Sequence, residues 1–323
     1  MDILKNIAII FISIFFESLP FLMLGSLISS IIETFISDET FAKLIPKNKI
    51  IGSLVGVFLG FFLPACDCAV IPVSKRLLKK KVPINVAIAF MLSSPIVNPV
   101  VLLSTYYAFY QTNPKIFWAR FILGIIISLI IGIIMGVLFG KKDVITNNLD
   151  ECNCASDIDE DFKELANEIN RNTSHHHHRK PKGTKNTIIH IFKHAAFDLF
   201  EVVKYLMIGA LIASLIQVLL PRNILTLFSS NNILSIIVLM IFAYLISLCS
   251  TSDSFVGKTL LPLFNTPSII AYLLLGPMIH IKNTIVLLGN YKKSFVITLI
   301  ILIFTVIFIS SILVVNILWK IDF

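Results

Sequence analysis

The chain has 323 residues, of which 56% are hydrophobic and 14% are charged, and its mean hydropathy is +0.89. Soluble domains carry about 25% charged residues, so these values exclude a soluble globular protein and indicate an integral membrane protein. We assign the net charge of +8 to basic residues at the cytoplasmic ends of membrane helices, not to nucleic-acid binding.

Apolar segments follow one another along the chain. A helix needs about 20 apolar residues to cross a hydrocarbon core of roughly 30 Å, and strand-like alternation is missing from the sequence. We therefore expect an all-α, polytopic membrane protein with about eight transmembrane helices, some of them broken. The eight segments are 3–36, 50–74, 82–109, 116–140, 188–220, 233–257, 267–290 and 294–320.

The first segment, 3–36, has no small-residue cleavage site after it, so we expect a retained helix and not a signal peptide. It is about 45 Å long at 1.5 Å per residue, which predicts a kink at Pro20 or an interfacial half-helix. Glu17 lies within it. A charge in the membrane usually faces a cavity and marks function, so Glu17 is a candidate proton or counter-ion site. The alternative is a neutral packing carboxyl.

The second segment contains "PACDCAVIPV", with Cys66, Asp67 and Cys68 between Pro64 and Pro72. On a helix, residues two apart point in nearly opposite directions, whereas extended backbone puts them on one face. The two thiols could coordinate one ion only if the prolines break the helix. Thiolates favour thiophilic ions. The competing interpretation treats the cysteines as small apolar packing residues.

The third segment contains "SSPIVNP", where two prolines and Asn98 interrupt an apolar run. Proline removes a backbone hydrogen bond and frees a carbonyl. The sequence therefore predicts a second break, with Asn98 as polar lining of a site.

Residues 141–186 differ in kind, with nine acidic and eight basic residues. They predict a charged, flexible cytoplasmic linker between a first transmembrane repeat, 1–140, and a second, 187–323. The linker also holds residues of a loose, low-specificity metal site: Cys152, Cys154, His175, His176, His177 and His178.

The two halves resemble each other. Residues 16–32 align with 200–216 at nine of seventeen positions, which places Glu17 on Glu201. Nearby offsets place Cys66 on Cys249 and Pro95 on Pro277. Four crossings per half would give a parallel repeat with both termini and the linker in the cytoplasm. A re-entrant cysteine segment would instead allow an inverted repeat.

The second half repeats the chemistry of the first. In "CSTSD", Cys249 and Asp253 are four apart and are expected to share a helix face without unwinding. "GPMIHIKN" predicts another break, with His280 at a depth similar to that of Asn98. A further stripe, His190, His194, Asp198 and Glu201, fits either a metal site or, as we favour, the polar face of an interfacial helix.

The motifs "PACDCAVIPVSKRLL", "SSPIVNP", "CSTSDSFV" and "GPMIHIKN" resemble those of the predicted permeases related to the bacterial organoarsenical-efflux permease. The chain is most similar to the subgroup described as one subunit of a two-component membrane permease complex. It differs at Ala69, where the family usually has glycine, and at His280, where the subgroup commonly has an acidic residue. The resemblance implies a multi-pass permease of the bacterial cytoplasmic membrane and a second membrane subunit as partner.

Taken together, the sequence predicts a permease that moves a small solute by alternating access, with no enzymatic chemistry and no cofactor. The solute is expected to be a thiophilic or divalent metal species. Efflux of arsenicals and a non-transporting, metal-sensing membrane subunit are the alternatives. A homo-oligomer is also compatible with the sequence. The predicted substrate-binding residues are Cys66, Asp67, Cys68, Asn98, Cys249, Asp253 and His280, with Glu17 and Glu201 as proton or counter-ion sites.

Overall fold

The computed structural model describes residues 2–35, 48–62, 67–140, 142–146, 184–219 and 232–317. Within these ranges every element is a helix apart from one isolated bridge, Ile145 to Tyr291. The all-α prediction is therefore confirmed for the described part of the chain. Most of the predicted linker, including its cysteines and histidines, lies outside the described residues.

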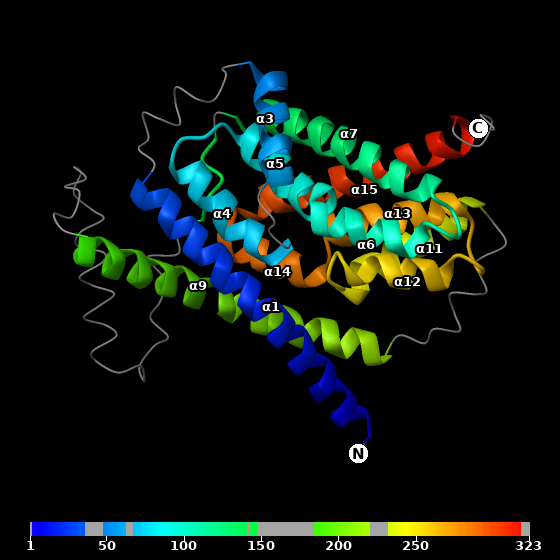
Figure 1. Cartoon of the computed structure of the whole chain (residues 1–323), viewed down its shortest axis with the longest axis horizontal. Coiled ribbons are helices and arrows are strands. Elements are labelled where there is room, and N and C mark those ends of the chain that lie inside the picture. Colours follow the sequence, from blue (N-terminus) through cyan, green and yellow to red (C-terminus); the bar gives the residue numbers. More distant parts are fainter. Residues whose placement is uncertain are drawn as a thin grey trace.

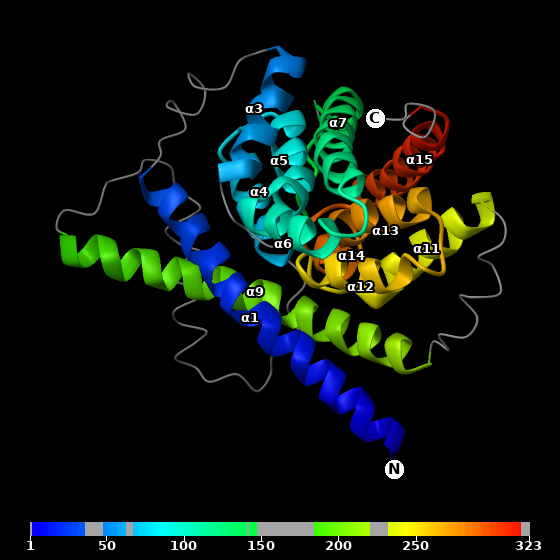
Figure 2. The same cartoon turned by 45° about the vertical axis from the view of Figure 1, so that its right-hand side comes forward.

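Two long helices cross each other on one side of the molecule, as both cartoon views show (Figures 1 and 2). They are α1 (Asp2–Phe35) and α9 (Thr184–Leu219), which correspond to the first and fifth apolar segments. Pro20 lies inside α1 without ending it.

The remaining helices form a bundle beside this crossed pair (Figure 1). Four apolar segments are each divided into two shorter helices, and two segments are single helices. The helices are α3 (Lys49–Phe62), α4 (Asp67–Lys79), α5 (Ile84–Val97), α6 (Pro99–Phe109), α7 (Lys115–Leu138), α11 (Asn232–Ile246), α12 (Ser252–Leu260), α13 (Thr266–Met278), α14 (Ile281–Asn290) and α15 (Lys293–Ile317).

Helices α3 and α5 run side by side in the same direction. At their first turns Asn85 Nδ2 donates to the carbonyl oxygen of Lys49 at 2.8 Å, and further along Gly60 packs against Ser94. Because two parallel helices that follow one another need a return path, α4 must bring the chain back. Helices α3 and α4 therefore form a hairpin that enters and leaves at the same end of the bundle.

Helices α11 and α13 repeat this arrangement. Asn265 Nδ2 donates to Asn232 Oδ1 at 2.8 Å, and the hydroxyls of Ser235 and Ser268 are 2.7 Å apart. Both contacts pair the start of α11 with the start of α13, so the two helices are parallel. Helices α11 and α12 are thus a second hairpin.

The two hairpins enter from opposite ends. Helix α7 is antiparallel to α5, because Gly136 packs against Asn85 while Gly124 packs against Ile96. The end of α7 continues to Val144, whose carbonyl accepts from the Lys292 backbone N–H at 2.9 Å. We call the end that holds residues 79–84, 138–146 and 290–293 the linker end; the first hairpin opens there.

The opposite end holds the turn between α6 and α7 and the starts of α11 and α13. Residues of all three line one cleft of about 390 Å³, among them Thr112, Asn232 and Asn265. We call this the far end; the second hairpin opens there.

The expectation that eight segments cross the membrane is not confirmed by the described helices. Helices α3 and α11 have 14 and 15 residues, or about 21 and 22 Å at 1.5 Å per residue, which is less than the roughly 30 Å of a hydrocarbon core. Within the described ranges, five helical stretches are long and apolar enough to cross. The segments 50–74, 188–220 and 233–257 contribute only shorter apolar helices, Lys49–Phe62, Val202–Val218 and Asn232–Ile246.

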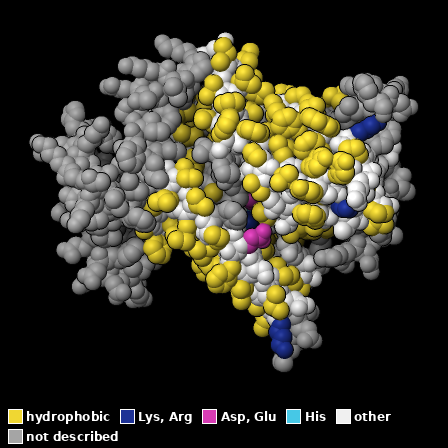
Figure 3. All heavy atoms as spheres, viewed as in Figure 1, with side chains coloured by type: hydrophobic (Ala, Val, Ile, Leu, Met, Phe, Trp, Pro, Cys, Tyr) yellow, Lys and Arg dark blue, Asp and Glu magenta, His cyan; other side chains and the backbone are white. Residues whose placement is uncertain are grey.

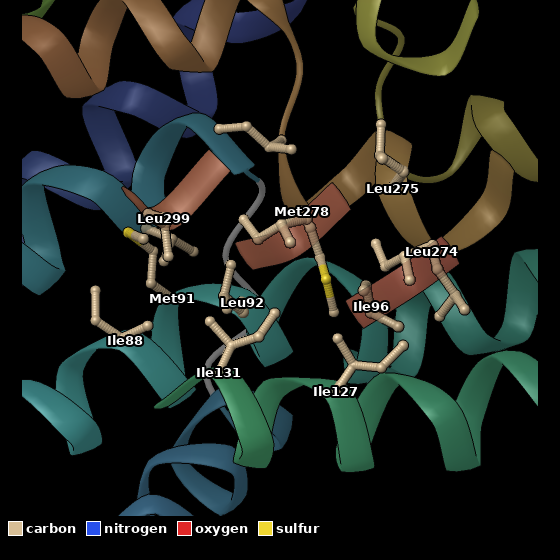
Figure 4. Packing of buried hydrophobic residues seen from close by; sticks show 14 of the residues in the cluster. Ile88, Met91, Leu92, Ile96, Ile127, Ile131, Leu274, Leu275, Met278 and Leu299 are labelled. Carbon is tan, nitrogen blue, oxygen red and sulfur yellow. The ribbon is translucent and has the colours of Figure 1, made fainter. Parts of the chain in front are cut away.

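The interrupted helices lie in the interior. In the most apolar part of Ile84–Phe109 and of Thr266–Asn290, 78% and 89% of the residues are buried, against 28% in that of Lys293–Leu313. Figure 4 shows their core, where Ile88, Leu92 and Ile96 of α5 meet Ile131 of α7 and Met278 of α13. The described part of the face seen in Figure 3 is mainly apolar. Breaks in the helices are thus shielded from lipid by protein, as a membrane protein requires.

We predict that Gly56 is required for the close contact of α3 and α5. A side chain there would collide with the Val86 carbonyl oxygen, so Gly56→Leu should cost about 1–3 kcal/mol through overpacking. Thermal unfolding in detergent measures this as a lower midpoint. Phe58→Leu, at a residue of α3 that is 63% exposed, should leave the midpoint unchanged; equal midpoints for the two variants would contradict this packing.

Candidate functional site

The break between α5 and α6 falls at Asn98. Its backbone is extended (φ −56°, ψ 132°), as expected for a residue before a proline, here Pro99. Asn98 Oδ1 accepts the Val100 backbone N–H at 2.9 Å and so caps α6. The predicted break is confirmed, and the Asn98 side chain is used as a helix cap.

The break between α13 and α14 falls at Ile279 and His280, both in extended conformation. Pro277, inside the last turn of α13, cannot donate a backbone hydrogen bond there. His280 is completely buried and caps α14, because its Nδ1 accepts the Asn283 backbone N–H at 3.2 Å. The second predicted break is therefore also confirmed.

His280 contacts Asp67, the first residue of α4. The His280 Nε2 and Asp67 Oδ2 atoms are 2.6 Å apart, and both side chains are buried. Because Nδ1 accepts a hydrogen bond, the ring proton sits on Nε2 and is donated to the carboxylate. This places the tip of the first hairpin against the break of a helix 213 residues later in the chain.

Two neighbours complete this cluster. Asn283 Nδ2 donates to the Asp67 carbonyl at 3.4 Å, while Asn283 Oδ1 is buried and has no hydrogen-bond partner among the described residues. Lys282 is buried, and its Nζ donates to Ser18 Oγ at 3.2 Å. Its charge acts on both Asp67 and Asp253. We call Asp67, His280, Lys282 and Asn283 the hairpin–break cluster.

Cys249 lies in the tip of the second hairpin. The prediction that a continuous helix carries Cys249 and Asp253 is wrong, because α11 ends at Ile246 and α12 begins at Ser252. Ser247 adopts a left-handed conformation (φ 53°), which no helix of L-residues continues. Cys249 is a free, half-buried thiol, and the charge of Asp67 acts on it.

Asp253 is buried in the first turn of α12. Its Oδ1 accepts from the Tyr272 hydroxyl at 3.2 Å, whereas its Oδ2 has no partner within the described ranges. Arg120 of α7, fully buried nearby, donates from Nη1 to Ser254 Oγ at 2.7 Å. Arg120 is not among the residues predicted from the sequence, because a basic residue near the start of a membrane helix is typical of a helix end.

Of the other predicted residues, the structure describes the side chain of Glu17 but not those of a larger set. Glu17 is exposed on α1, and its charge acts on Cys249. Among the described residues no three His, Cys, Asp or Glu side chains are grouped to hold a metal ion. Those that lie outside the described residues, or whose side chains do, are Cys66, Cys68, Glu201, His190, His194, Asp198 and the linker residues. Pro72, expected to help break the helix, lies inside α4.

Comparison with known proteins identifies the class of molecule. Residues 3–316 match the family described as "predicted permease" (ArsP_1). The chain belongs to this permease family. It is accordingly a multi-pass bacterial membrane protein, and the family indicates a transporter rather than an enzyme.

Two relatives align along most of their length. A Streptococcus mutans protein named a two-component membrane permease complex subunit is 34% identical over 287 residues, covering 89% of this chain and 87% of the relative. The Bacillus subtilis UPF0718 protein YcgR is 37% identical over 313 residues, covering 94% and 95%. No solved structure matches the chain.

We predict that Asp67 and His280 stabilise the permease as a pair. Removing one partner leaves the other buried and unpaired, which costs about 3–5 kcal/mol, so Asp67→Ala and His280→Ala should each be strongly destabilising. The double variant should lose about 1–3 kcal/mol less unfolding free energy than the sum of the losses in the two single variants. Unfolding in detergent measures this coupling.

The matched control combines Asp67→Ala with Tyr291→Phe. Tyr291 contacts α4 through Ser74 at 2.7 Å and not through Asp67, so these two effects should add to within about 0.5 kcal/mol. Additive losses for Asp67 and His280 would show that the pair is not coupled.

Proposed function

We propose that this permease moves a small thiophilic or divalent metal species across the cytoplasmic membrane by alternating access. The observation that supports it most is the contact between Asp67, at the tip of one hairpin, and His280, at the break of a distant helix. Helix breaks in the membrane occur where the backbone lines a site. A buried carboxylate beside one is a functional position by default.

The ligand chemistry follows from the residues around this contact. Asp67 offers a carboxylate and Asn283 an unused carbonyl oxygen, which suit a cation. Cys66 and Cys68 flank Asp67 in the chain, and thiolates favour soft ions. Asn98, Cys249 and Asp253 would line the same path from the other hairpin and the first break.

We further propose that residues 1–140 and 187–323 are inverted repeats. Each half has a long helix, a hairpin, a broken helix and a last helix, in that order. The hairpins open at opposite ends, and α4 packs beside α14 as α12 packs beside α6. With the hairpins re-entrant and the 36-residue α9 counted as a crossing, each half has three crossings, an odd number, and this inverts the second half.

This arrangement suits alternating access, because inverted halves can exchange conformations around a fixed site. Lysines at the linker end, among them Lys79, Lys80 and Lys81, place that end in the cytoplasm by the positive-inside rule. The termini then lie at the far end, outside, in place of the cytoplasmic termini expected from four crossings per half. Glu17 and Glu201 would serve as proton or counter-ion sites.

A second membrane subunit is the partner we propose, since the Streptococcus mutans relative is named a subunit of a two-component complex. A homo-oligomer and a low-affinity linker metal site at Cys152, Cys154 and His175–His178 also remain proposals. The thiols favour arsenical efflux as the second candidate function. A metal-sensing subunit that moves no solute is the third.

We predict that flux depends on the thiols beside Asp67. In liposomes, Cys66→Ala plus Cys68→Ala should lower flux of the transported species by about tenfold or more, because its first ligands are lost. Divalent zinc and cadmium are compared with trivalent arsenicals to separate the two transport candidates.

Thr298→Ala plus Thr305→Ala is the control and should leave flux unchanged, since these exposed hydroxyls of α15 donate to carbonyls of their own helix. Equal flux in the Cys66/Cys68 variant and the wild type would make the thiols packing residues. Stoichiometric metal binding without flux of any species would favour the metal-sensing subunit.

A further inference from the structure

Arg120 is the largest fully buried side chain described in the protein. It lies on α7, a helix that crosses the bundle and is apolar after its first turns. Placing a guanidinium in such a helix is costly, so membrane proteins keep it only where partners or ligands compensate.

The guanidinium joins three elements at the tip of the second hairpin. Nη1 donates to Thr105 Oγ1 of α6 and to Ser254 Oγ of α12, both at 2.7 Å. Nη2 donates to the Ser250 carbonyl at 3.3 Å. All three acceptors are neutral oxygens, so these bonds hold the arginine in place without neutralising its charge.

Two polar atoms in this cluster have no partner within the described part of the chain: Arg120 Nε and Asp253 Oδ2. Both residues are at least 98% buried, and the charge of each acts on the other. Buried donors and acceptors are rarely left unpaired unless a ligand or water uses them. One unused donor and one unused acceptor therefore remain in the same buried cluster.

Asp253 Oδ2 packs closely against α13, because its neighbour there is a glycine. A Cβ atom at Gly276 of α13 would lie 2.5 Å from it, so a larger residue would displace the carboxylate. On its other side Asp253 is held by the Tyr272 hydroxyl through Oδ1. The free oxygen is thus fixed in position by α13.

We infer that Arg120 and Asp253 form a second solute-binding site of the permease, specific for a ligand that carries an O–H group. Arg120 Nε–H donates to the ligand oxygen, and Asp253 Oδ2 accepts its proton in a hydrogen bond. A water ligand of a hydrated divalent cation and a hydroxyl of an uncharged oxyacid share this chemistry. The inference rests on the proposed function and adds Arg120 to its site residues. The second hairpin would then recognise an O–H group of the solute, while the first hairpin would bind the solute through thiols.

The test measures binding to the purified full-length protein in detergent. Two probes separate the sources of the O–H group: zinc ion, which is hydrated, and arsenous acid, which is an uncharged hydroxide near neutral pH. A ligand that binds the folded protein raises its thermal midpoint with concentration, and this yields a Kd for each variant.

Arg120→Lys keeps the positive charge but loses the Nε–H donor, and it should weaken binding of one of the probes by about tenfold. Asp253→Asn should weaken binding of the same probe. If Arg120→Lys does not fold, Asp253→Asn alone tests the site. Ser128→Ala is the control, because Ser128 is a buried hydroxyl further along α7 without a partner among described residues. It should leave the Kd unchanged.

The inference would be overturned if Arg120→Lys and Asp253→Asn bound both probes with the wild-type Kd. A bridging water would then be the hydrogen-bond partner of Arg120 Nε and Asp253 Oδ2. Failure of both probes to bind the wild type at millimolar concentration would overturn it as well. If the Arg120 variant transports normally while Cys66→Ala plus Cys68→Ala does not, the second site is wrong and the proposed function stands. If neither variant changes flux, the second site is wrong and the thiols are packing residues.

Discussion

The structure depends on hiding interrupted helices inside an apolar body. Helices α5, α11 and α13 end in the interior, where lipid offers nothing to their free carbonyls. Side chains and close packing solve this problem locally. Asn98 and His280 cap the helices that follow, and the surrounding α5, α7, α13 and α15 bury the breaks in hydrophobic contacts.

Capping leads directly to the site. Because His280 uses Nδ1 for the cap, its Nε2 is free to meet Asp67, and the first hairpin is thereby joined to the second half. The second hairpin is joined to the first half by a different residue, Arg120. The two tips are therefore held by unlike chemistry, an acid with a histidine in one case and an arginine with neutral oxygens in the other.

Much of this could be predicted from sequence because polar residues and prolines are conspicuous in an apolar chain. The breaks at Asn98 and at Ile279–His280 were signalled by prolines, and Asp67 by its charge. The break at Ser247 carries no proline, and its left-handed backbone is set by tertiary contacts. Arg120 lies near the start of α7, where a basic residue is typical of a helix end.

The return of the hairpins could not be predicted, because 50–74 and 233–257 have the length of a membrane crossing. In the first hairpin, Gly56 and Gly60 pack against α5 and keep α3 parallel to it. In the second, the side chains of Asn232 and Ser235 bond to residues at the start of α13. Periodicity within one segment carries no information about such a neighbour. His280 gains its meaning only beside Asp67, which the chain brings to it from 213 residues away.

The most direct test of this account is the sidedness of the two hairpins. Single cysteines are introduced at exposed positions, in a variant without the native cysteines, at Asn48 and Lys81 for the first hairpin and at Asn232 and Leu263 for the second. A membrane-impermeant maleimide should label both members of a pair from the same side of the membrane, and the two pairs from opposite sides. Labelling of Asn48 and Lys81 positions from opposite sides would show that the first cysteine segment crosses the membrane, and would contradict the account.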